Sequence, residues 1–376
     1  MSDVRSVYFP ALTGLRAVAA AMVVLHHFNP INPARFGWRA HGLVAELHIG
    51  VTVFFVLSGF LIGYRYVGGP PVALRTYFAN RFARIYPMYF LLTTVTFVLV
   101  YGRTLVSNSR QLTEYLLNIT FLRGLFEEYL YTGIAQGWSL TVEEMFYVSA
   151  PLAFWLVARR RQWLWQLPLL LGALGVGLVL LCRHQPWHGF LASFNFLFQF
   201  TYLGRAVEFF TGIALAWWLR RPASHSVPIR WLTYVGLAGM LLCLGGLSLL
   251  HGPSLGAFGV MQPAGMFINN VLLPLFGIGP LLWGLVREAT WLSRLLSTRP
   301  LLLLGKSSYV FYLIHMGPIR TLLHQQLQHA WLTLAAVYGA SVLLYWLVEE
   351  PLNRWLRRVL RRPAATSAFR VIAPNA

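Results

Sequence analysis

The chain has 376 residues, of which 57% are hydrophobic and only 11% are charged. Soluble domains usually carry about 25% charged residues, so the composition excludes an ordinary water-soluble domain and predicts an all-α integral membrane protein. The formal net charge is +19, and the basic residues are arginines apart from Lys306. The two cysteines, Cys182 and Cys243, lack the spacing of metal ligands, so we expect no structural zinc site.

About 20 apolar residues are needed to cross the hydrocarbon core of a membrane once. On this measure we expect about ten transmembrane helices, near residues 11–28, 48–67, 85–102, 138–158, 162–182, 196–219, 231–250, 265–286, 306–323 and 331–348. A short polar segment near 112–123, with Glu114 and Arg123, is expected to lie at the surface. Residues 1–350 are then the membrane domain and 351–376 a basic cytosolic tail.

The distribution of arginine predicts the orientation of these spans. With a cytosolic N-terminus, most basic residues fall in cytosolic turns, such as Arg159–Arg161 between the fourth and fifth spans. Lys and Arg are enriched in cytoplasmic loops, so both termini are expected in the cytosol and the chain in the inner (cytoplasmic) membrane. Because the positive charge is spread over every cytosolic turn, we expect membrane lipid and no nucleic acid as a partner.

The first span carries two ionisable residues on one face. A charge at mid-membrane costs at least about 2.5 to 3.5 kcal/mol, so each such residue is a candidate for a functional site. Arg16 and His27 are eleven residues apart and therefore face the same way, whereas His26 lies about 80° away. The spacing favours His27 over His26 as a catalytic imidazole, although an interfacial role for both histidines is equally compatible with it.

The segment GWSLTVEEMFY places Ser139, Glu143 and Tyr147 on one helix face. A carboxylate near the start of an apolar helix serves as a general base, orients a histidine, or stabilises the helix N-terminus. In RFARIYP, just before the third span, Arg81 and Arg84 are three residues apart. Paired guanidinium groups suit phosphate, with cytosolic anchoring as the alternative.

Three weaker signals lie further along the chain. Arg205 and Glu208 are an i, i+3 pair that neutralises itself inside the membrane. His315 follows Tyr312 at the same spacing in the ninth span. In VEEP, Pro351 is expected to end the tenth span just after Glu349.

Taken in order, seven segments resemble the acyltransferase 3 family, membrane enzymes that move acyl groups from acyl-coenzyme A to sugars and other hydroxylated acceptors. The segments are LTGLRAVAAAMVVLHHF, GVTVFFVLSGFLIGY, RFARIYP, GWSLTVEEMFY, RAVEFFTG, SSYVFYLIH and VEEP. The resemblance spans nearly the whole chain. It implies essential roles for the family's motif residues, which correspond here to Arg16, His27, Arg81, Arg84, Trp138, Ser139, Glu143 and Glu349.

The resemblance also has a gap and leaves choices open. Thr52 stands where the family commonly has an acid, which weakens any role for an acid there. Some members carry a periplasmic hydrolase-like domain, and this chain is expected to act with the membrane module alone. The expected donor is acyl-coenzyme A, with acetyl as the acyl group. A metal is not expected, because a thioester is already activated.

The resemblance gives a cell-surface polysaccharide, an O-antigen or a lipid-linked sugar as the expected acceptor. Acylation of a glycosylated secondary metabolite such as a macrolide is an alternative. A multi-span solute or polysaccharide transporter is the rival class, because buried Arg, Glu and His also fit a substrate pathway. His27 is expected to act as general base or as a transient acyl carrier, and the sequence leaves this choice and the oligomeric state open.

Overall fold

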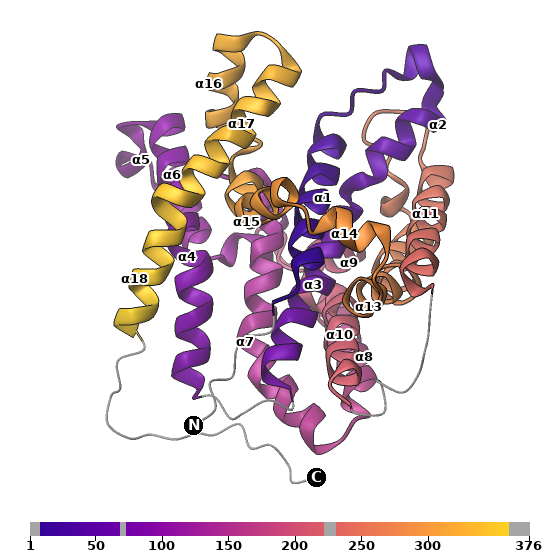
Figure 1. The fold of residues 1–376 in the computed structure, drawn as a ribbon. Helices are drawn as coiled ribbons and strands as arrows, with labels where there is room; N and C mark the ends of the chain where they lie inside the picture. The colour runs from indigo at the N-terminus through magenta and orange to yellow at the C-terminus, as the bar shows by residue number, and fades with distance from the viewer. Residues whose placement is uncertain (1–7, 68–72, 222–230, 361–376) are drawn as a thin grey trace. The chain divides into compact units, whose positions relative to one another are not determined.

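The computed structural model describes residues 8–67, 73–221 and 231–360, and within these ranges it contains helices and no strand (Figure 1). The expectation of an all-α chain is confirmed. The chain divides into two compact units. Unit 1 comprises Met1–Gly69, Leu156–Gly172 and Gly204–Lys306, and unit 2 comprises Pro70–Trp155, Ala173–Leu203 and Ser307–Ala376.

Unit 1 begins with α1 (Pro10–His27), which packs against α3 (Ile49–Tyr66). Proline suits the first position of a helix because its missing N–H has no partner there. Between these helices lie α2 (Pro33–Ala45), which bends at Gly37, and the short 3₁₀ segment η1 (Glu46–His48). The apolar residues of α1 are largely buried, so α1 forms part of the core of unit 1.

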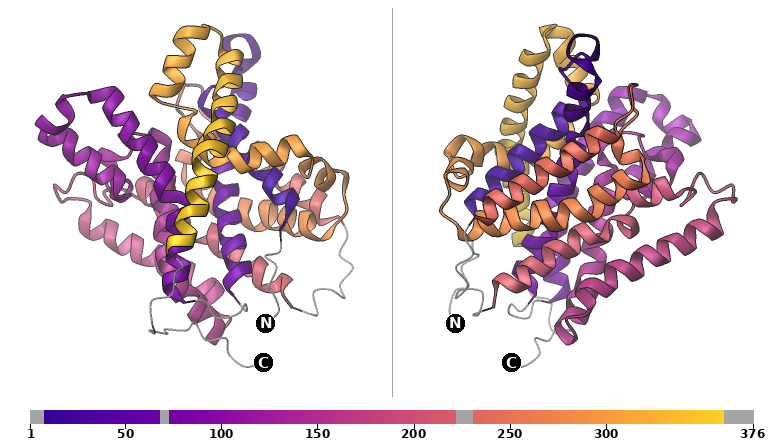
Figure 2. Two further views of the ribbon diagram at one scale, coloured as in Figure 1. Left: turned by 60° about the vertical axis from the view of Figure 1, so that its left-hand side comes forward. Right: turned by 90° about the vertical axis from the view of Figure 1, so that its right-hand side faces the viewer.

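The remainder of unit 1 is a second group of helices. It comprises the end of α7 (Trp138–Arg159), the first half of α8 (Trp163–Cys182), most of α10 (Tyr202–Leu219), α11 (Leu232–Leu250), η6 (Gly259–Met261), α12 (Pro263–Phe267), the π-helical segment η7 (Ile268–Ile278), α13 (Gly279–Arg287), α14 (Trp291–Leu296) and the first half of α15 (Arg299–Ile314). Helix α11 packs along η7 and α13, and Figure 2 shows these segments side by side. Pro274 lies within η7, where it has no N–H to give to an α-helical ladder.

Helices α3 and α10 touch through their backbones. A Cβ atom on Gly59 would lie 2.0 Å from the carbonyl oxygen of Phe209, and one on Gly212 would lie 2.2 Å from that of Val56. Only glycine allows such an approach, and membrane helices commonly pack through small residues in this way. This contact brings the middle of α10 close to α3.

We expect Gly212→Leu to force α3 and α10 apart, because an added side chain in a packed interface costs about 1 to 3 kcal/mol or more. Thermal unfolding in detergent measures the effect. Gly245→Leu is the matched control, because a Cβ there meets no atom within 4 Å. Equal melting temperatures for the two variants would contradict the close approach.

Unit 2 is built on α4 (Leu74–Tyr101), a 28-residue helix with Pro87 inside it. It is followed by α5 (Thr104–Ser107), α6 (Ser109–Ile119), η2 (Leu122–Leu125), η3 (Glu127–Tyr129), η4 (Ala135–Gly137), most of α7 (Trp138–Arg159), the second half of α8 (Trp163–Cys182) and α9 (Phe194–Phe200). The unit ends with the last turns of α15, α16 (Pro318–Leu327), α17 (Ala330–Leu344), π-helical η8 (Tyr345–Glu349) and α18 (Glu350–Leu360).

Seven helical stretches of the described chain are long and apolar enough to cross a membrane. They are Pro33–Tyr66, Leu74–Tyr101, Ala135–Arg159, Trp163–Cys182, Leu232–Leu250, Pro263–Arg287 and Ala330–Leu360. The other three predicted spans correspond to α1, to α9 with α10, and to α15 with α16. The ten spans and the cytosolic termini stay predictions.

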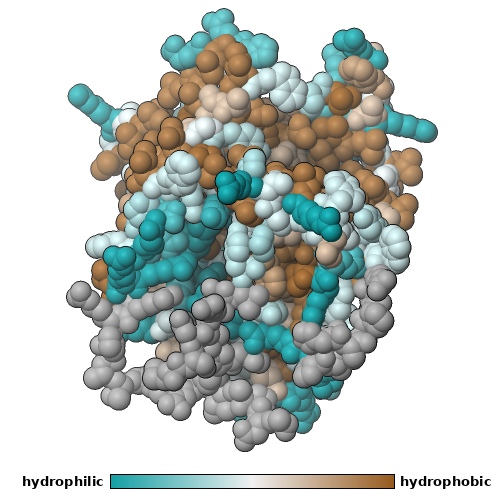
Figure 3. All heavy atoms as spheres, in the orientation of Figure 1, coloured by the Kyte–Doolittle hydropathy of each residue, from teal (hydrophilic) through white to brown (hydrophobic). Residues whose placement is uncertain are grey.

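The exposed surface of these helices is apolar. Leu242 on α11 and Val148 on α7 are 77% and 67% exposed. Figure 3 shows apolar residues, in brown, over much of the visible face, and hydrophilic ones, in teal, over α18. Large exposed apolar patches are rare on soluble proteins, so this surface is that of a multi-pass membrane protein.

Several predicted boundaries were wrong. Helix α4 begins at Leu74 and not near 85, so RFARIYP lies inside it, because a helix accommodates one proline with a local bend. The sixth predicted span is broken at Thr201, whose backbone is extended. The ninth is broken before α16 at Gly317, whose φ is 87°.

The prediction that Pro351 ends a helix was also wrong. The chain continues through α18 to Leu360, because Pro351 lies in the first turn after the π-helical segment η8, where proline is tolerated. Residues 351–360 of the predicted tail are therefore helical, and residues 361–376 lie outside the described residues.

Candidate functional site

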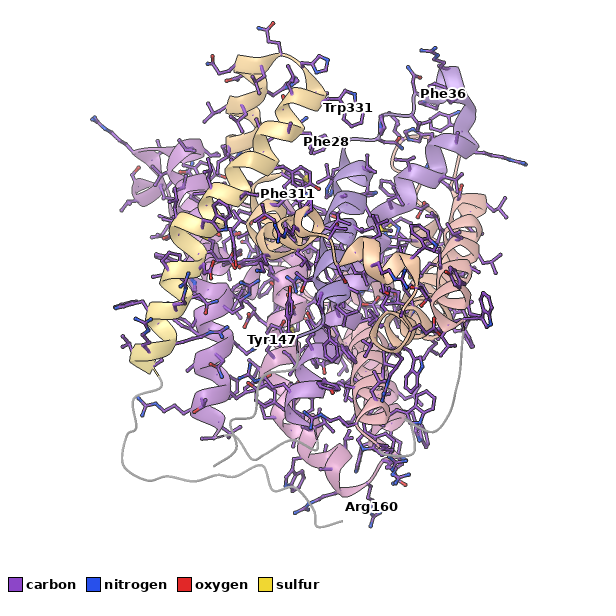
Figure 4. The ribbon with its side chains drawn as sticks, in the orientation of Figure 1. Phe28, Phe36, Tyr147, Arg160, Phe311 and Trp331 are labelled. Carbon is purple, nitrogen blue, oxygen red and sulfur yellow. The ribbon has the colours of Figure 1, made fainter. Side chains whose placement is uncertain are left out.

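Unit 1 carries the predicted pair of α1. Arg16 is half-buried, and its guanidinium carbon lies 5.5 Å from the ring centre of Phe54 on α3, a cation–π contact. His27 is the last residue of α1, directly before Phe28, which is labelled in Figure 4. The ring centre of His27 lies 4.9 Å from that of His26. The end of α1 therefore presents two adjacent imidazoles.

A buried polar group surrounds Arg205 near the start of α10. Its guanidinium donates to Glu208 at 2.7 Å and to the hydroxyl of Thr52 at 2.9 Å. The self-neutralising pair predicted from the i, i+3 spacing is thus confirmed. Thr52 in turn donates to Asn269 at 3.0 Å, and Asn269 donates to Asn270. At the position of the missing acid, a hydroxyl links the ion pair to η7.

Unit 2 brings together the arginines of α4 and the residues of α7 and η8. The guanidinium of Arg84 donates to the carboxylate of Glu349, an ion pair that the sequence analysis did not predict. The guanidinium carbon of Arg81, one turn earlier, lies 5.6 Å from the ring centre of Tyr147. Figure 4 labels Tyr147 on α7. Among the described residues Arg81 forms no ion pair, and its Nε atom is buried without a hydrogen-bond partner.

The helix face predicted for α7 is confirmed. The hydroxyl of Tyr147 donates to the carboxylate of Glu143, one turn back. The carbonyl oxygen of Tyr147 accepts a hydrogen bond of 2.9 Å from the hydroxyl of Tyr77 on α4. Glu143 is thus linked through Tyr147 to the helix that carries Arg81.

Ser139 lies at the other end of this face and contacts α15. Its hydroxyl lies 2.7 Å from that of Tyr312. The side-chain amide of Gln136 donates to the carbonyl oxygens of Tyr312 and Leu313, at 2.8 and 3.1 Å. His315 is buried, and its Nδ1 lies 2.8 Å from the carbonyl oxygen of Tyr312. These contacts tie the start of α7 to the end of α15.

Trp138 and Arg123 support this arrangement. The Trp138 ring packs edge-on against Phe200, with 4.9 Å between ring centres. Arg123, expected at the surface, is instead wholly buried and donates to the carbonyl oxygens of Thr132 and Ile134. Burial lowers the pKa of the Arg123 guanidinium. Glu114 is also buried, and its carboxylate accepts hydrogen bonds from the Tyr101 hydroxyl and from Nε of Arg110.

The ion pair of Arg84 makes a prediction about stability. We expect Arg84→Ala to cost about 2 kcal/mol, because it leaves the carboxylate of Glu349 buried without its counter-ion. The Glu349 side chain is 2% exposed and that of Arg84 is 28% exposed. A double-mutant cycle of Arg84→Met and Glu349→Met, measured by thermal unfolding, is expected to give a coupling energy of about 1 kcal/mol or more.

The matched control for this cycle is the surface pair Arg354 and Glu350, whose side chains are 64% and 37% exposed. A guanidinium nitrogen of Arg354 lies 3.0 Å from a carboxylate oxygen of Glu350. We expect about 0.5 kcal/mol or less for it. Equal coupling energies for the two pairs would contradict the expectation that burial strengthens the pair of Arg84 and Glu349.

The predicted site residues fall into both units. Arg16, His27, Arg205 and Glu208 belong to unit 1, and the others belong to unit 2. Glu46 was not among the predicted residues, although it is wholly buried and contacts His48 and His251. In the described part of the chain, no group of three His, Cys, Asp or Glu side chains is arranged to hold a metal ion.

An all-helical membrane protein with ionisable side chains on α1, α4, α7 and α10 fits the class of multi-pass membrane enzymes. The model of a family described as an acyltransferase domain matches residues 9–350. The chain belongs to this family, whose members transfer acyl groups. The assignment favours an enzyme over the rival transporter.

Individual relatives agree with this assignment. The chain is 27% identical to the peptidoglycan O-acetyltransferase OatA of Listeria monocytogenes, over 92% of this chain and 56% of that protein. It is 28% identical to the acyltransferase MdmB of Streptomyces mycarofaciens, over 96% of each chain. It is 23% identical to the O-acetyltransferase OatA of Staphylococcus aureus, over 94% of this chain and 57% of that protein. The chain thus spans little more than half the length of the OatA proteins. No solved structure matches it.

Proposed function

We propose that the protein is a membrane-bound O-acyltransferase that moves an acyl group, expected to be acetyl, from cytosolic acyl-coenzyme A to a hydroxyl of a carbohydrate. The observation that carries the proposal is the family match over residues 9–350. The relatives named as O-acetyltransferases support acetyl as the group, and the one named for peptidoglycan supports a carbohydrate acceptor.

The donor side of the proposal rests on α4. A guanidinium group forms a bidentate fork that matches a phosphate. Arg84 is already paired with Glu349, whereas Arg81 has a buried Nε without a hydrogen-bond partner. We therefore assign the main phosphate contact of coenzyme A to Arg81. Arg84 joins it when its pair with Glu349 opens.

The acceptor side rests on the end of α1. His27 takes the proton of the acceptor hydroxyl, and the oxygen attacks the thioester carbonyl. The carbon–sulfur bond then breaks, and the coenzyme A thiolate leaves and takes up the proton. Positioned proton transfer of this kind contributes roughly 10² to 10⁴ in rate. Arg16, on the same face of α1, stabilises the negative charge that develops on oxygen.

Transfer of the labelled acetyl group from acetyl-coenzyme A by the purified protein in nanodiscs tests this proposal. The acceptors are a peptidoglycan fragment, an O-antigen, a lipid-linked oligosaccharide and a glycosylated macrolide. We expect an acetyl ester on one of the carbohydrates, whereas an ester on the macrolide alone would move the acceptor to secondary metabolites. Transfer to none of them, by protein shown to be folded, would contradict the proposal.

A further inference from the structure

A cluster of histidines surrounds one buried carboxylate in unit 1. Glu46, in η1, is 0% exposed. Its carboxylate accepts from Nε2 of His48 at 2.8 Å, from Nδ1 of His251 at 2.9 Å and from the backbone N–H of Gly259 at 2.5 Å. A buried carboxylate is tolerated only when donors compensate for its lost hydration. Glu46 thereby joins η1 to the segment that follows α11.

The segments packed around this carboxylate, three elements and one loop, carry further titratable or charged side chains besides its direct partners His48 and His251. The further residues are His26 and His27 on α1 and Arg39 and His41 on α2, whereas His48 lies on η1 and His251 after α11. His251 is held on one side only. Its Nδ1 faces Glu46, while its Nε2 is buried without a hydrogen-bond partner among the described residues.

Three contacts connect Glu46 to His26. The ring of His48 meets that of His26 edge-on, with 5.5 Å between centres. The ring of Phe258, the residue before Gly259, lies 5.1 Å from that of His26. The carbonyl oxygen of Ala45, the residue before Glu46, contacts Nδ1 of His26. The surroundings of His26 are therefore fixed by the segments that Glu46 holds.

The contact with Ala45 determines the protonation pattern of His26. A carbonyl oxygen only accepts hydrogen bonds, so Nδ1 of His26 must carry the proton. In the neutral ring the proton-accepting atom is then Nε2. Histidines that act as general bases use this arrangement, in which a hydrogen bond at one ring nitrogen leaves the other nitrogen free of a proton.

We propose that Glu46 is a positioning residue for the histidines at the end of α1, holding His26 as its Nδ1–H tautomer beside His27. The inference rests on the proposed function for the use made of these histidines. It goes beyond that function in assigning a role to a carboxylate and to an imidazole outside the motif pair Arg16 and His27.

The test compares Glu46→Gln with Glu288→Gln. Glutamine keeps the size of Glu46, but it loses the charge and replaces one acceptor oxygen with a donor group. Glu288 is the matched control in unit 1, because its carboxylate accepts from the backbone N–H groups of Leu232 and Thr233. Two readouts are used, the ¹⁵N NMR signals of histidine-labelled protein and the steady-state constants for acetyl-coenzyme A.

In the wild type we expect the ¹⁵N signals of His26, assigned with a His26→Phe variant, to show the Nδ1–H tautomer. In Glu46→Gln we expect both tautomers, with kcat lowered about tenfold or more and KM for acetyl-coenzyme A within about twofold. Glu288→Gln is expected to match the wild type in both readouts. If Glu46→Gln does not fold, His48→Gln, which keeps an N–H for Glu46 and removes the ring beside His26, is expected to give the same mixture.

Each other outcome separates the inference from the function on which it rests. His26 signals and kcat unchanged in folded Glu46→Gln would overturn the positioning role. The NMR readout needs no substrate. A loss of the tautomer in Glu46→Gln, in protein whose wild type transfers no acyl group, would support the positioning role and contradict only the proposed function.

Discussion

Replacing His27 with alanine is expected to lower acyl transfer by about 10²-fold or more, because the proton of the acceptor hydroxyl loses its base. Binding of coenzyme A is expected to be unchanged, because the donor phosphates are assigned to α4. Transfer of labelled acetyl and equilibrium binding of coenzyme A, measured on the same preparation, separate the two effects.

The matched control is His184→Ala, because His184 is exposed and lies outside the candidate site. It is expected to keep wild-type transfer. Near-normal transfer by folded His27→Ala would show that this assignment is wrong. If a histidine instead carries the acyl group, rapid mixing with acetyl-coenzyme A is expected to give a burst of coenzyme A release before the steady state.

The largest effect on stability is expected at the buried pair of α10. Arg205→Leu leaves the carboxylate of Glu208, which is 0% exposed, without its counter-ion. Breaking a buried pair by removing one partner costs about 3 to 5 kcal/mol. We therefore expect a large fall in melting temperature for Arg205→Leu, measured by thermal unfolding in detergent.

Removing both charges is expected to reverse much of this loss, because Arg205→Leu with Glu208→Leu leaves no uncompensated ion. Thr52 and Asn269 lose their link to the pair in both variants, so the recovery is expected to be incomplete. Arg354→Leu, at an exposed arginine that also pairs with a glutamate, is the control and is expected to alter the free energy of unfolding by less than about 0.5 kcal/mol. If the Arg205→Leu variant were as stable as this control variant, the claim that Glu208 needs the charge of Arg205 would be wrong.

Local patterns in the sequence predicted what depends on local structure. Apolar runs predicted the helices, and the i, i+4 spacing placed Glu143 and Tyr147 on one helix face, where they form a hydrogen bond. The i, i+3 spacing of Arg205 and Glu208 predicted their ion pair. These predictions succeed because helical geometry fixes which side chains are neighbours one turn apart.

Contacts between distant helices could not be predicted. Arg84 and Glu349 are 265 residues apart, Thr52 and Asn269 are 217 apart, and Glu46 and His251 are 205 apart. The period of a helix says which residues share a face and not which other helix packs against that face. Glu46 carried no signal of its own, because a single acid before an apolar run reads as an interfacial residue.

Helix ends were predicted less well than helix centres. Pro351 was predicted to end a helix, yet it lies in a helix that continues, as Pro87 does within α4. A proline removes one hydrogen bond, and packing and π-helical geometry nearby decide whether the helix survives that loss. Gly317 marks a true break, since its φ of 87° is outside the helical region.

Equilibrium binding of radiolabelled coenzyme A to the purified protein tests whether it uses an acyl-coenzyme A donor, because every such donor contains coenzyme A. The variants are Arg81→Ala and, on the same helix, the exposed control Arg75→Ala. Specific binding by the wild type and Arg75→Ala, weakened about tenfold or more in Arg81→Ala, is the expected result, because a hydrogen bond to a charged group contributes about 1.5 to 3 kcal/mol. Absence of specific binding by folded wild-type protein would contradict the proposed transfer from acyl-coenzyme A.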